Sequence, residues 1–467
     1  MKTKFLQPLL PFLILLTIPL TTKAYDFQAG GLCYNILTDS TVEVTYLKDY
    51  VHGGNRSYVS GDLIIPSTVA HDRTWYSVTA IGQFAFSDCT GLTSVTIPNS
   101  VTTIGGWAFY VCSGLTSVTI PNSVTTIGNG AFVDCSGLTS VTIPNSVSAI
   151  GVAAFYGCSG LTSVTIPNSV TTIGGRAFCR CSGLTSVTIP NSVGSIGPIA
   201  FYKCTGLTSL TIPNSVTTIG SGAFEGCTGL ISVTIPNSVT SIGANPFSCC
   251  TNLEKIKVES GNSIYDSREG CNAIIETSTN SLISGCKKTV IPNSVDSIGF
   301  VAFCGCTGLT SVTIPNSVTT IGRGAFKGCS GLTSVTIPNS VTTIDSQAFD
   351  GCTALESIQV LATMPPSSSS SMFSDETYSQ ANLYIPKGCI TAYRSDEEWG
   401  RFSNIVESSF IKGDVDLDET VNTGDATALV NHLLNAKSVP HFSADINGDN
   451  QVNTSDVTAI ISIILSE

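Results

Sequence analysis

Between residues 61 and 360, apolar and polar positions repeat with a period of 23 residues. Each period contains an alternation such as Val95, Thr96 and Ile97, which predicts a short strand with one buried face. A corner of Pro, Asn and Ser follows, because proline cannot continue a strand ladder and Asn and Ser bind turn backbone locally. The leucine of each period recurs at Leu92, Leu115, Leu138, Leu161, Leu184, Leu207, Leu230 and Leu253, then at Leu309, Leu332 and Leu355.

The second half of each period is expected to bring the chain back across the core. In the first full repeat, this part supplies the apolar residues Val101, Ile104, Ala108 and Phe109. Leu92 breaks the alternation of the strand, so we expect it to enter the core from the preceding turn. One unit of this size cannot bury its apolar face alone, whereas stacked units can. The predicted fold class is therefore a mainly-β solenoid of 23-residue repeats.

Two side-chain types recur at fixed positions and predict a structural role. A stack of phenylalanine rings is far more often core than ligand site. Eleven cysteines form a second column, and in-register side chains stand about 4.8 Å apart without converging to the ~3.8 Å that the Cβ atoms of a disulfide need. We interpret them as buried thiols that act as small apolar residues. The phenylalanines are Phe109, Phe132, Phe155, Phe178, Phe201 and Phe224.

Two cysteines outside that column are the best disulfide candidate. Cys271 and Cys286 flank a predicted hairpin whose turn lies at residues 277–280. The two side chains are expected to face each other there, and disulfides persist in exported proteins.

The segments around the repeats divide the chain further. Residues 1–24 have a positive start, an apolar middle and small residues at the end, which predict a secretory signal peptide. Residues 25–60 suit an N-terminal β cap, and residues 361–410 a C-terminal cap with large apolar side chains. Residues 254–290 break the period and predict an irregular insert that bulges from the solenoid as a hairpin.

Composition and charge argue against several functions. Only 12% of the residues are charged and the net charge is −12, which excludes the basic surface of a nucleic-acid binder. The mature chain has no apolar segment long enough to span a membrane. The four histidines lie outside the regular repeats and the acids within them are scattered, so neither a triad nor a carboxylate pair is expected. We therefore predict that the protein is not an enzyme.

The C-terminal segment, residues 411–467, carries nine acidic and two basic residues in two loops of equal spacing. Oxygen side chains at loop positions 1, 3, 5, 9 and 12, with the carbonyl of position 7, are the ligands that wrap Ca²⁺. Each loop leads into an apolar helix, so two calcium sites are predicted in a small all-α domain. The predicted ligands are Asp414, Asp416, Asp418, Thr420, Asn422 and Asp425, then Asp445, Asn447, Asp449, Gln451, Asn453 and Asp456.

The repeat unit itself resembles a known family. Leu-Thr-Ser-Val-Thr-Ile-Pro-Asn-Ser-Val-Thr-Thr-Ile-Gly-x-x-Ala-Phe is similar to the BspA-like leucine-rich repeat, also called the treponemal type, over roughly residues 61–360. This resemblance implies a bacterial surface or secreted protein with an adhesive or binding role, since some members bind host matrix proteins or other bacteria. The family motif does not encode a ligand, so no binding residue is implied.

The tail resembles a type I dockerin, whose duplicated loop–helix segments lack the first helix of a full EF-hand. The resemblance implies docking onto a cohesin module through loop positions 10 and 11. Glu419 replaces the usual glycine at position 6, which predicts a weaker first site because glutamate tolerates the left-handed turn poorly. The docking residues implied by the resemblance are Thr423, Gly424, Thr454 and Ser455, of which Gly424 replaces a usual hydroxyl.

These features predict a secreted or cell-surface, non-catalytic binding or adhesion protein. Its solenoid would bind a host matrix protein, a bacterial surface protein or a glycan, and its tail would bind calcium and a cohesin-like partner. The outward rows of threonine suit such binding, although threonine is also simply a favoured solvent-facing strand residue. Two alternatives stay open: an adhesin whose calcium module is purely structural, and a non-catalytic component of a polysaccharide-degrading complex.

Overall fold

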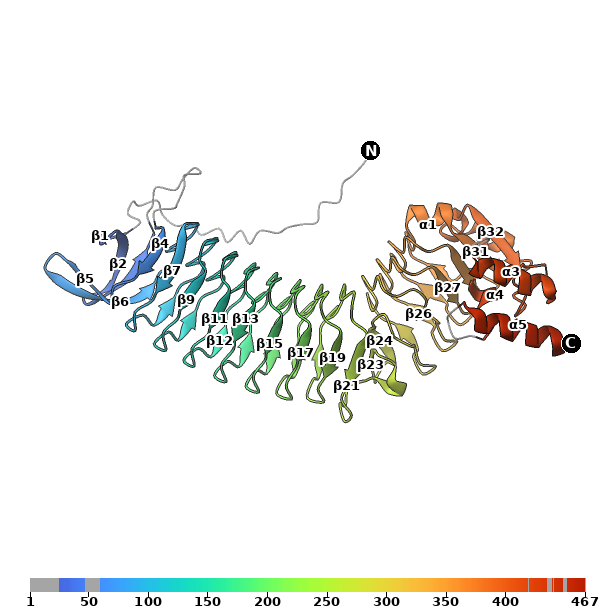
Figure 1. Cartoon of the computed structure of the whole chain (residues 1–467), viewed down its shortest axis with the longest axis horizontal. Coiled ribbons are helices and arrows are strands. Elements are labelled where there is room, and N and C mark those ends of the chain that lie inside the picture. The colour runs from blue at the N-terminus through green and yellow to red at the C-terminus, as the bar shows by residue number, and fades with distance from the viewer. Residues whose placement is uncertain are drawn as a thin grey trace.

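The computed structural model describes residues 25–46, 59–418, 420–434, 439, 441–447 and 452–466. The predicted signal peptide therefore lies outside the described residues. The chain forms a curved, mainly-β solenoid of about 14 turns, with most of the helices at its C-terminal end (Figure 1). This confirms the predicted fold class.

Each regular turn begins with a short strand that follows the conserved leucine position. These strands pair in parallel with a 23-residue register, for example Val95 with Val118. Val95 and Ile97 are buried and Thr96 is exposed, as the alternation predicts, and Leu92 is buried as well. The strands are β7 (Leu92–Thr96), β9 (Ser117–Thr119), β11 (Ser140–Thr142), β13 (Ser163–Thr165), β15 (Ser186–Thr188), β17 (Ser209–Thr211), β19 (Ser232–Ile235), β21 (Lys255–Val258), β27 (Ser334–Ile337) and β29 (Ser357–Val360).

A second strand of two residues follows the Pro-Asn-Ser corner, and our sequence analysis did not predict it. In most turns it places one polar residue outside and one isoleucine inside, as at Thr103 and Ile104, and it also pairs in parallel with its neighbours. These strands are β8 (Thr103–Ile104), β10 (Thr126–Ile127), β12 (Ala149–Ile150), β14 (Thr172–Ile173), β16 (Ser195–Ile196), β18 (Thr218–Ile219), β20 (Ser241–Ile242), β25 (Ser297–Ile298), β26 (Thr320–Ile321), β28 (Thr343–Ile344) and β30 (Ser367–Ser368).

The predicted phenylalanine and cysteine columns lie in the core. Consecutive rings stack with their centroids 5.1 Å apart between Phe109 and Phe132 and 5.4 Å apart between Phe201 and Phe224. Each column cysteine stays a free thiol, and Cys112, for example, donates to the carbonyl of Phe86 at 3.0 Å. Burial raises the pKa of the Cys112 thiol, so these side chains behave as small apolar residues, as predicted.

Hydroxyl groups of the threonine and serine rows also hold neighbouring turns together. The Thr116 hydroxyl donates to the carbonyl of Thr93 at 3.0 Å, and the Ser123 hydroxyl donates to Val101 at 2.6 Å. Because the same bonds recur along the array, these rows stabilise the stacking of repeats. These bonds support the interpretation that the outward threonines and serines have a structural role in the array.

The turn that contains the phenylalanine holds two residues in the left-handed backbone region. They lie two positions before and two positions after the ring, as at Trp107 (φ 51°) and Val111 (φ 57°). Some repeats place glycine there, such as Gly130, whereas others place a branched residue such as Ile199 (φ 58°). Left-handed backbone costs such side chains roughly 1–2 kcal/mol, so the array carries local strain at these positions.

The N-terminal end of the solenoid is covered by antiparallel strands. Strands β1 (Phe27–Ala29), β2 (Leu32–Thr38) and β3 (Thr41–Thr45) form a meander that joins β6 (Thr74–Ile81), which in turn pairs with β8. Phe27 and Tyr34 stack within it. Two further strands, β4 (Gly61–Ile64) and β5 (Thr68–His71), pair with β7 and β6. Residues 47–58 of the predicted cap lie outside the described residues.

The insert is less irregular at its start than predicted. Strand β21 continues the ladder with β19 at the regular register, so the period ends only after Val258. The chain then forms β22 (Tyr265–Asp266), a 3-10 turn at Arg268–Gly270, and an antiparallel hairpin of β23 (Ile274–Glu276) and β24 (Ser281–Ser284). We call β23 and β24 the insert hairpin. Strand β24 pairs in parallel with β25, so this hairpin is part of the solenoid wall as well.

The insert hairpin divides the hydrophobic core into two clusters. Ile274 packs in the N-terminal cluster, whereas Ala273, Ile275 and Leu282 pack in the C-terminal one. Alternate residues of a strand point to opposite faces, so a single hairpin can contribute to both cores.

All the cysteines are free thiols in the structure, so the predicted Cys271–Cys286 disulfide is not formed there and stays a prediction. Cys271 packs in the C-terminal cluster and Cys286 in the N-terminal one. A bulge at Ile274 shifts the register of the hairpin, and pairing ends before either cysteine is reached. The Cys286 thiol instead donates to the carbonyl of Asn272 at 3.3 Å.

The C-terminal end of the solenoid is closed by a mixed αβ segment (Figure 1). Its elements are α1 (Asp375–Gln380), β31 (Asn382–Pro386), α2 (Ile390–Ser395), a 3-10 turn at Trp399–Arg401 and β32 (Asn404–Ser408). Strands β31 and β32 extend the sheet of β27 and β29. The fully buried Trp399 packs against Phe373, the last ring of the phenylalanine stack, and donates its indole N–H to Pro366 at 3.0 Å.

Candidate functional site

The first acidic loop brings three carboxylates together. One oxygen of each of Asp414, Asp416 and Asp418 lies within 4.8 Å of the others. Asp414 is buried, while Asp416 and Asp418 are exposed. Hydrogen bonds from the side chain and backbone of Thr420 lower the pKa of Asp418, which favours its charged form. Among the described residues, this is the one cluster of acidic, His or Cys side chains whose geometry suits a metal ion.

The carboxylate at the end of this loop has a different environment. Asp425 is fully buried and its Oδ1 accepts the backbone N–H groups of Val415 at 2.6 Å and Asp416 at 3.1 Å. Its Oδ2 accepts the N–H of Asn422 at 2.8 Å. A carboxylate oxygen offers two lone pairs, so Oδ2 retains a site for a cation. Asp425 therefore joins the start of the loop to its end through backbone hydrogen bonds.

The second loop repeats this arrangement. Asp456 is fully buried, its Oδ1 accepts from Ile446 at 2.8 Å and Asn447 at 3.1 Å, and its Oδ2 accepts from Asn453 at 2.9 Å. Asp445 is half-buried at the start of the loop. The predicted ligands Asp449 and Gln451 lie outside the described residues.

One predicted ligand of each loop caps the helix that follows. The Asn422 side chain caps α3 (Thr423–Leu433) by accepting the Gly424 N–H at 2.6 Å, and its amide donates to the Thr420 hydroxyl at 2.8 Å. Asn453 does the same in the second loop, accepting the Ser455 N–H at 2.8 Å at the start of α5 (Thr454–Ser466). Ligand positions and helix caps therefore share the same residues.

The two halves of this domain form one small core. Val415 and Ile446 follow the first ligand of each loop, and Leu429 and Ile460 lie at the same place in α3 and α5. A short helix, α4 (His441–Ala444), adds Ala444 to the buried set. Each residue of one half has its counterpart 31 positions later, as expected for a duplicated segment.

The same duplication leaves matched apolar side chains exposed. Val430 and Ile461 are 40% and 44% exposed, and Leu434 and Leu465 are 71% and 81% exposed. On each helix they share a face with exposed threonines, since residues four or three apart are neighbours on a helix. Our sequence analysis missed this face, although the exposed positions recur with the same 31-residue offset. Each face comprises residues at equivalent positions: Thr423, Thr427 and Val430 of α3 with Leu434 directly after it, and Thr454, Thr458, Ile461 and Leu465 of α5.

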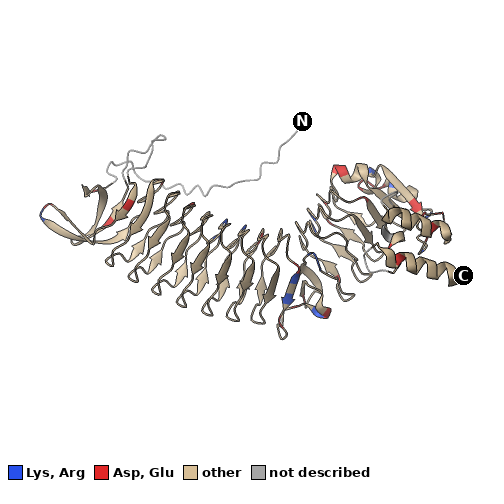
Figure 2. Cartoon of the chain, in the orientation of Figure 1, with Lys and Arg blue, Asp and Glu red and all other residues tan. Residues whose placement is uncertain are grey.

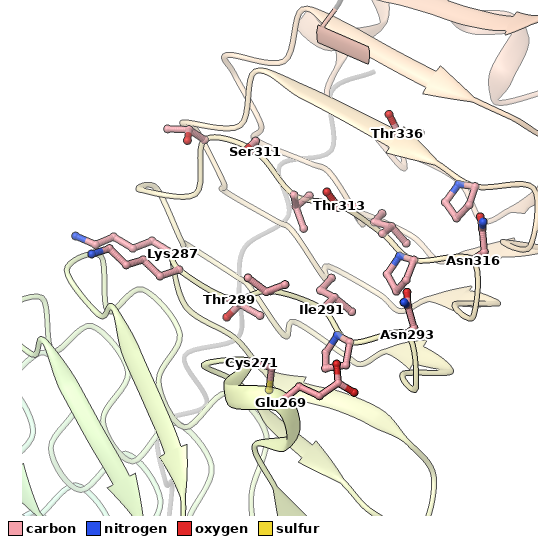
Figure 3. Close-up of a pocket in the computed structure, with 18 of the residues that line it drawn as sticks. Glu269, Cys271, Lys287, Thr289, Ile291, Asn293, Ser311, Thr313, Asn316 and Thr336 are labelled. Carbon is pink, nitrogen blue, oxygen red and sulfur yellow. The ribbon is translucent and has the colours of Figure 1, made fainter. Parts of the chain in front are cut away.

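The solenoid carries a second candidate, a groove of about 1010 Å³ beside the insert (Figure 3). The ladder of first strands stops at Val258 and resumes with β27, and a single bridge from Thr313 to Thr336 lies between them. Residues 287–291 and 310–314 line the hollow that results. Figure 3 shows Thr289, Ile291 and Thr313 along the groove and Lys287 at its rim.

Charge is rare on the regular turns and gathers at the ends and at the insert (Figure 2). At the groove, Lys287 and Lys288 both pair with Glu254, at 3.0 Å and 2.8 Å. The exposed apolar side chain of Val290 (72%) lies beside them. The groove therefore combines hydroxyl groups, a paired charge cluster and an accessible apolar contact.

Comparison with known proteins agrees with this architecture. Residues 74–185, 171–283 and 273–395 match the BspA type leucine rich repeat region, and together these segments span more than half of the chain. The chain belongs to the BspA-type leucine-rich repeat family. Residues 412–465 match the dockerin type I domain. Both resemblances inferred from the sequence are thereby confirmed.

Solved structures of other leucine-rich repeat proteins share the fold. A leucine-rich cell surface protein from Faecalibacterium prausnitzii is 31% identical, with 79% of this chain and 98% of that chain covered and a TM-score of 0.54. A leucine-rich repeat protein from Bacteroides ovatus is 28% identical, with 80% and 98% covered and a TM-score of 0.51. No curated protein matches this chain.

The two matched families are a repeat module and a docking module, which are non-catalytic types. In the part of the chain that the structure describes, no helix is long and apolar enough to cross a membrane. The leucine-rich repeat array and the dockerin domain are thus the two parts that any function must use.

Proposed function

We propose that this leucine-rich repeat protein is a secreted or cell-surface, non-catalytic binding protein that a calcium-dependent docking domain attaches to a cohesin-type partner. The observation that carries the proposal is the duplicated exposed face of α3 and α5 beside the acidic loops. A solvated acidic tail does not explain why two large apolar side chains are exposed at equivalent positions of each helix. Exposed apolar groups flanked by polar ones are typical of protein-binding surfaces.

Calcium would act on this face indirectly. The converging carboxylates of Asp414, Asp416 and Asp418 repel one another, and a divalent cation among them removes that repulsion. The fit is good because the donors are hard oxygens at alternating positions. Since Asn422 belongs to the same loop and caps α3, an ordered loop also fixes the start of the helix that presents the docking face. We propose the same role for the second loop.

Binding to purified cohesin modules, measured by calorimetry with full-length protein, tests this proposal. We expect micromolar or tighter binding in calcium that is lost in chelator. Because the face is duplicated, Leu434→Asp or Leu465→Asp alone should weaken binding by only a few fold, whereas both together should reduce it at least 100-fold. Val152→Asp, which changes an exposed apolar residue of the array, is the matched control.

Four outcomes are informative. Binding that persists in chelator would overturn the calcium dependence. Full affinity of the double variant would overturn the assignment of the face. If calcium orders the domain but no cohesin binds, the alternative of an adhesin with a purely structural calcium module is favoured. Cohesin binding within a set of polysaccharide-degrading proteins would instead favour the non-catalytic component of such a complex.

The groove beside the insert is the place where we propose that the solenoid binds its own ligand, an extended protein segment or a glycan. The regular turns are closed by their own ladders, whereas the first-strand ladder is interrupted at the groove and leaves an accessible hollow. This proposal also agrees with the concentration of charge and apolar exposure there.

Immobilised matrix proteins and glycans can test this site. Val290→Asp should reduce binding of the recognised ligand at least tenfold, because it places a charge on the exposed apolar contact of the groove. Ile231→Asp changes a comparably exposed apolar residue of a regular turn and should leave binding unchanged. Equal losses in both variants would show that the ligand uses the array surface in general.

A further inference from the structure

The two parts of the solenoid meet directly at one edge of the insert. The turn at residues 247–250 stacks on the turn at residues 303–306, although the whole insert separates them in the sequence. The backbone N–H of Cys249 donates to the carbonyl of Cys304 at 2.9 Å, the same bond that joins consecutive turns elsewhere. We call this contact the junction. The insert therefore leaves and re-enters the array at Cys249 and Cys304.

The two cysteines of the junction face each other. Counted within their own turns, Cys249 and Cys304 occupy adjacent positions of the repeat. The cysteines of the core column, in contrast, all occupy the same position of the repeat. A backbone hydrogen bond between neighbouring strands places Cα atoms about 5 Å apart, within the roughly 4.4–6.8 Å that disulfides use. The Cys304 thiol is hydrogen-bonded to the Cys249 sulfur. The column thiols, in contrast, donate to phenylalanine carbonyls.

The junction is also accessible. Cys249 and Cys304 are partly exposed, unlike the buried column cysteines. The Cys249 sulfur lies over Gly305, where any side chain would collide with it. The hydrogen bond from Cys304 lowers the pKa of Cys249 to about 7, against the opposing effects of burial and of Glu225, and Lys203 adds to the lowering. This shift favours the reactive thiolate form of Cys249.

We propose that Cys249 and Cys304 form a disulfide that joins the two hydrophobic cores across the junction. Five cysteines line the small cavity there, but a metal cage is not supported. Among the described residues, the only side chains that converge as metal ligands are those of the first acidic loop. The cavity cysteines are Cys249, Cys250, Cys286, Cys304 and Cys306.

The reaction needs a disulfide as oxidant, such as oxidised glutathione or the disulfide of a thiol oxidase. The Cys249 thiolate attacks one sulfur of that disulfide, a mixed disulfide forms, and one thiolate leaves. Cys304 then loses its proton and attacks the Cys249 sulfur, which releases the second thiolate. Two electrons pass from the cysteine pair to the oxidant, and the protons of the two protein thiols balance the two thiols that are released.

The bond would close a loop that contains the entire insert. Cross-linking restricts the unfolded chain more strongly as the closed loop becomes longer. The interruption between the two hydrophobic clusters would then be held covalently.

Oxidation of the full-length protein by glutathione tests the proposal. After acid quenching and maleimide labelling, mass spectrometry should find a linked pair of peptides containing Cys249 and Cys304, with neither residue labelled. The melting midpoint of the array should rise by roughly 5 °C on oxidation. In Cys304→Ser, Cys249 should instead retain one glutathione, and the rise should disappear.

Cys389→Ser is the matched control, because it removes a partly exposed cysteine outside the junction and should change neither result. Cys304→Ala repeats the test should the serine variant fold poorly. The proposal is overturned if both junction cysteines are labelled after oxidation, or if each carries its own glutathione.

Discussion

The repeat array and the C-terminal domain are built on opposite balances of apolar and acidic side chains. In the array, Phe155, Cys158 and Leu161 of a single turn are all fully buried, and the neighbouring turns repeat them. In the C-terminal domain, the described core has five buried apolar residues, and two fully buried carboxylates lie beside them. The array gains core with every turn, whereas the domain has a small core beside its buried acids.

The 23-residue unit of the array and the loop–helix unit of the C-terminal domain are both duplicated, but with different results. Copying a 23-residue unit adds core at every step, because each copy buries the face of the previous one. Copying the loop–helix unit once adds little core, and it creates two acidic loops and two exposed helix faces. Stability accumulates in the first case, and in the second the proposed docking surface is doubled.

Removing calcium should give the largest difference between the two regions. We expect chelator to abolish the hydrogen-exchange protection of α3 and α5, because the carboxylates of Asp414, Asp416 and Asp418 then repel each other in a domain with a small core. Peptides from β7 to β19 should keep their protection. Asp425→Ala with Asp456→Ala should give the chelator result even in calcium. Unchanged protection of both helices in chelator would contradict the dependence.

Truncating one ring of the stack should have the next largest effect. Phe155→Ala removes a fully buried ring between two stacked neighbours, and we expect it to reduce the free energy of unfolding of the array by about 3–5 kcal/mol. Denaturant unfolding followed by circular dichroism measures this change. Ser163→Ala, at an exposed strand position, should change stability by less than about 0.5 kcal/mol. Similar losses in both variants would argue against a core dominated by the ring stack.

Relieving backbone strain should give the smallest effect, and one of opposite sign. Ile199 has left-handed backbone where other repeats have glycine, so Ile199→Gly should stabilise the array by about 1 kcal/mol. Ile199→Asn should give part of this gain, because asparagine tolerates that conformation. Ile199→Val keeps the branched side chain and is the control. A destabilising Ile199→Gly would mean that the packing of the isoleucine outweighs its strain.

The sequence predicts the solenoid well because each turn repeats the same local rules. The inward positions of Leu92, Val95 and Ile97 follow from alternation and stacking alone, and the structure confirms them. The two-residue strand at Thr103 and Ile104 was missed, since so short a segment has too little alternation to distinguish it from a turn. This strand forms because its backbone pairs with the strands of the neighbouring turns, which is a tertiary contact.

The insert exposes the limit of such local rules. The sequence indicates a hairpin, but the bulge at Ile274 depends on which side chains two separate cores can accommodate. Cys271 and Cys286 therefore pack in different hydrophobic clusters. The contact of Cys249 with Cys304 could not be inferred from spacing, because it depends on where the chain re-enters the array.

In the C-terminal domain, the spacing of acids indicates the loops, and the family comparison supports their type. The structure adds that Asp425 and Asp456 also bind backbone N–H groups, and that Asn422 also caps a helix. These second roles depend on the folded loop. The proposed docking face was not predicted, because exposure cannot be inferred from the sequence of a helix whose apolar residues are spread around it.

The constant register between neighbouring turns also makes the array a spacer of adjustable length. Because every turn offers the next one the same hydrogen bonds and the same ring, a 23-residue unit can be added or removed without changing any interface. Each unit changes the reach of the array by about 4.8 Å, the spacing of neighbouring strands. The groove lies on the C-terminal side of the regular turns that precede the insert, so a change in the number of those turns would leave the groove where it is relative to the dockerin domain. Each added or removed turn would change the distance from the N-terminal cap to the groove and to the dockerin domain by the same amount.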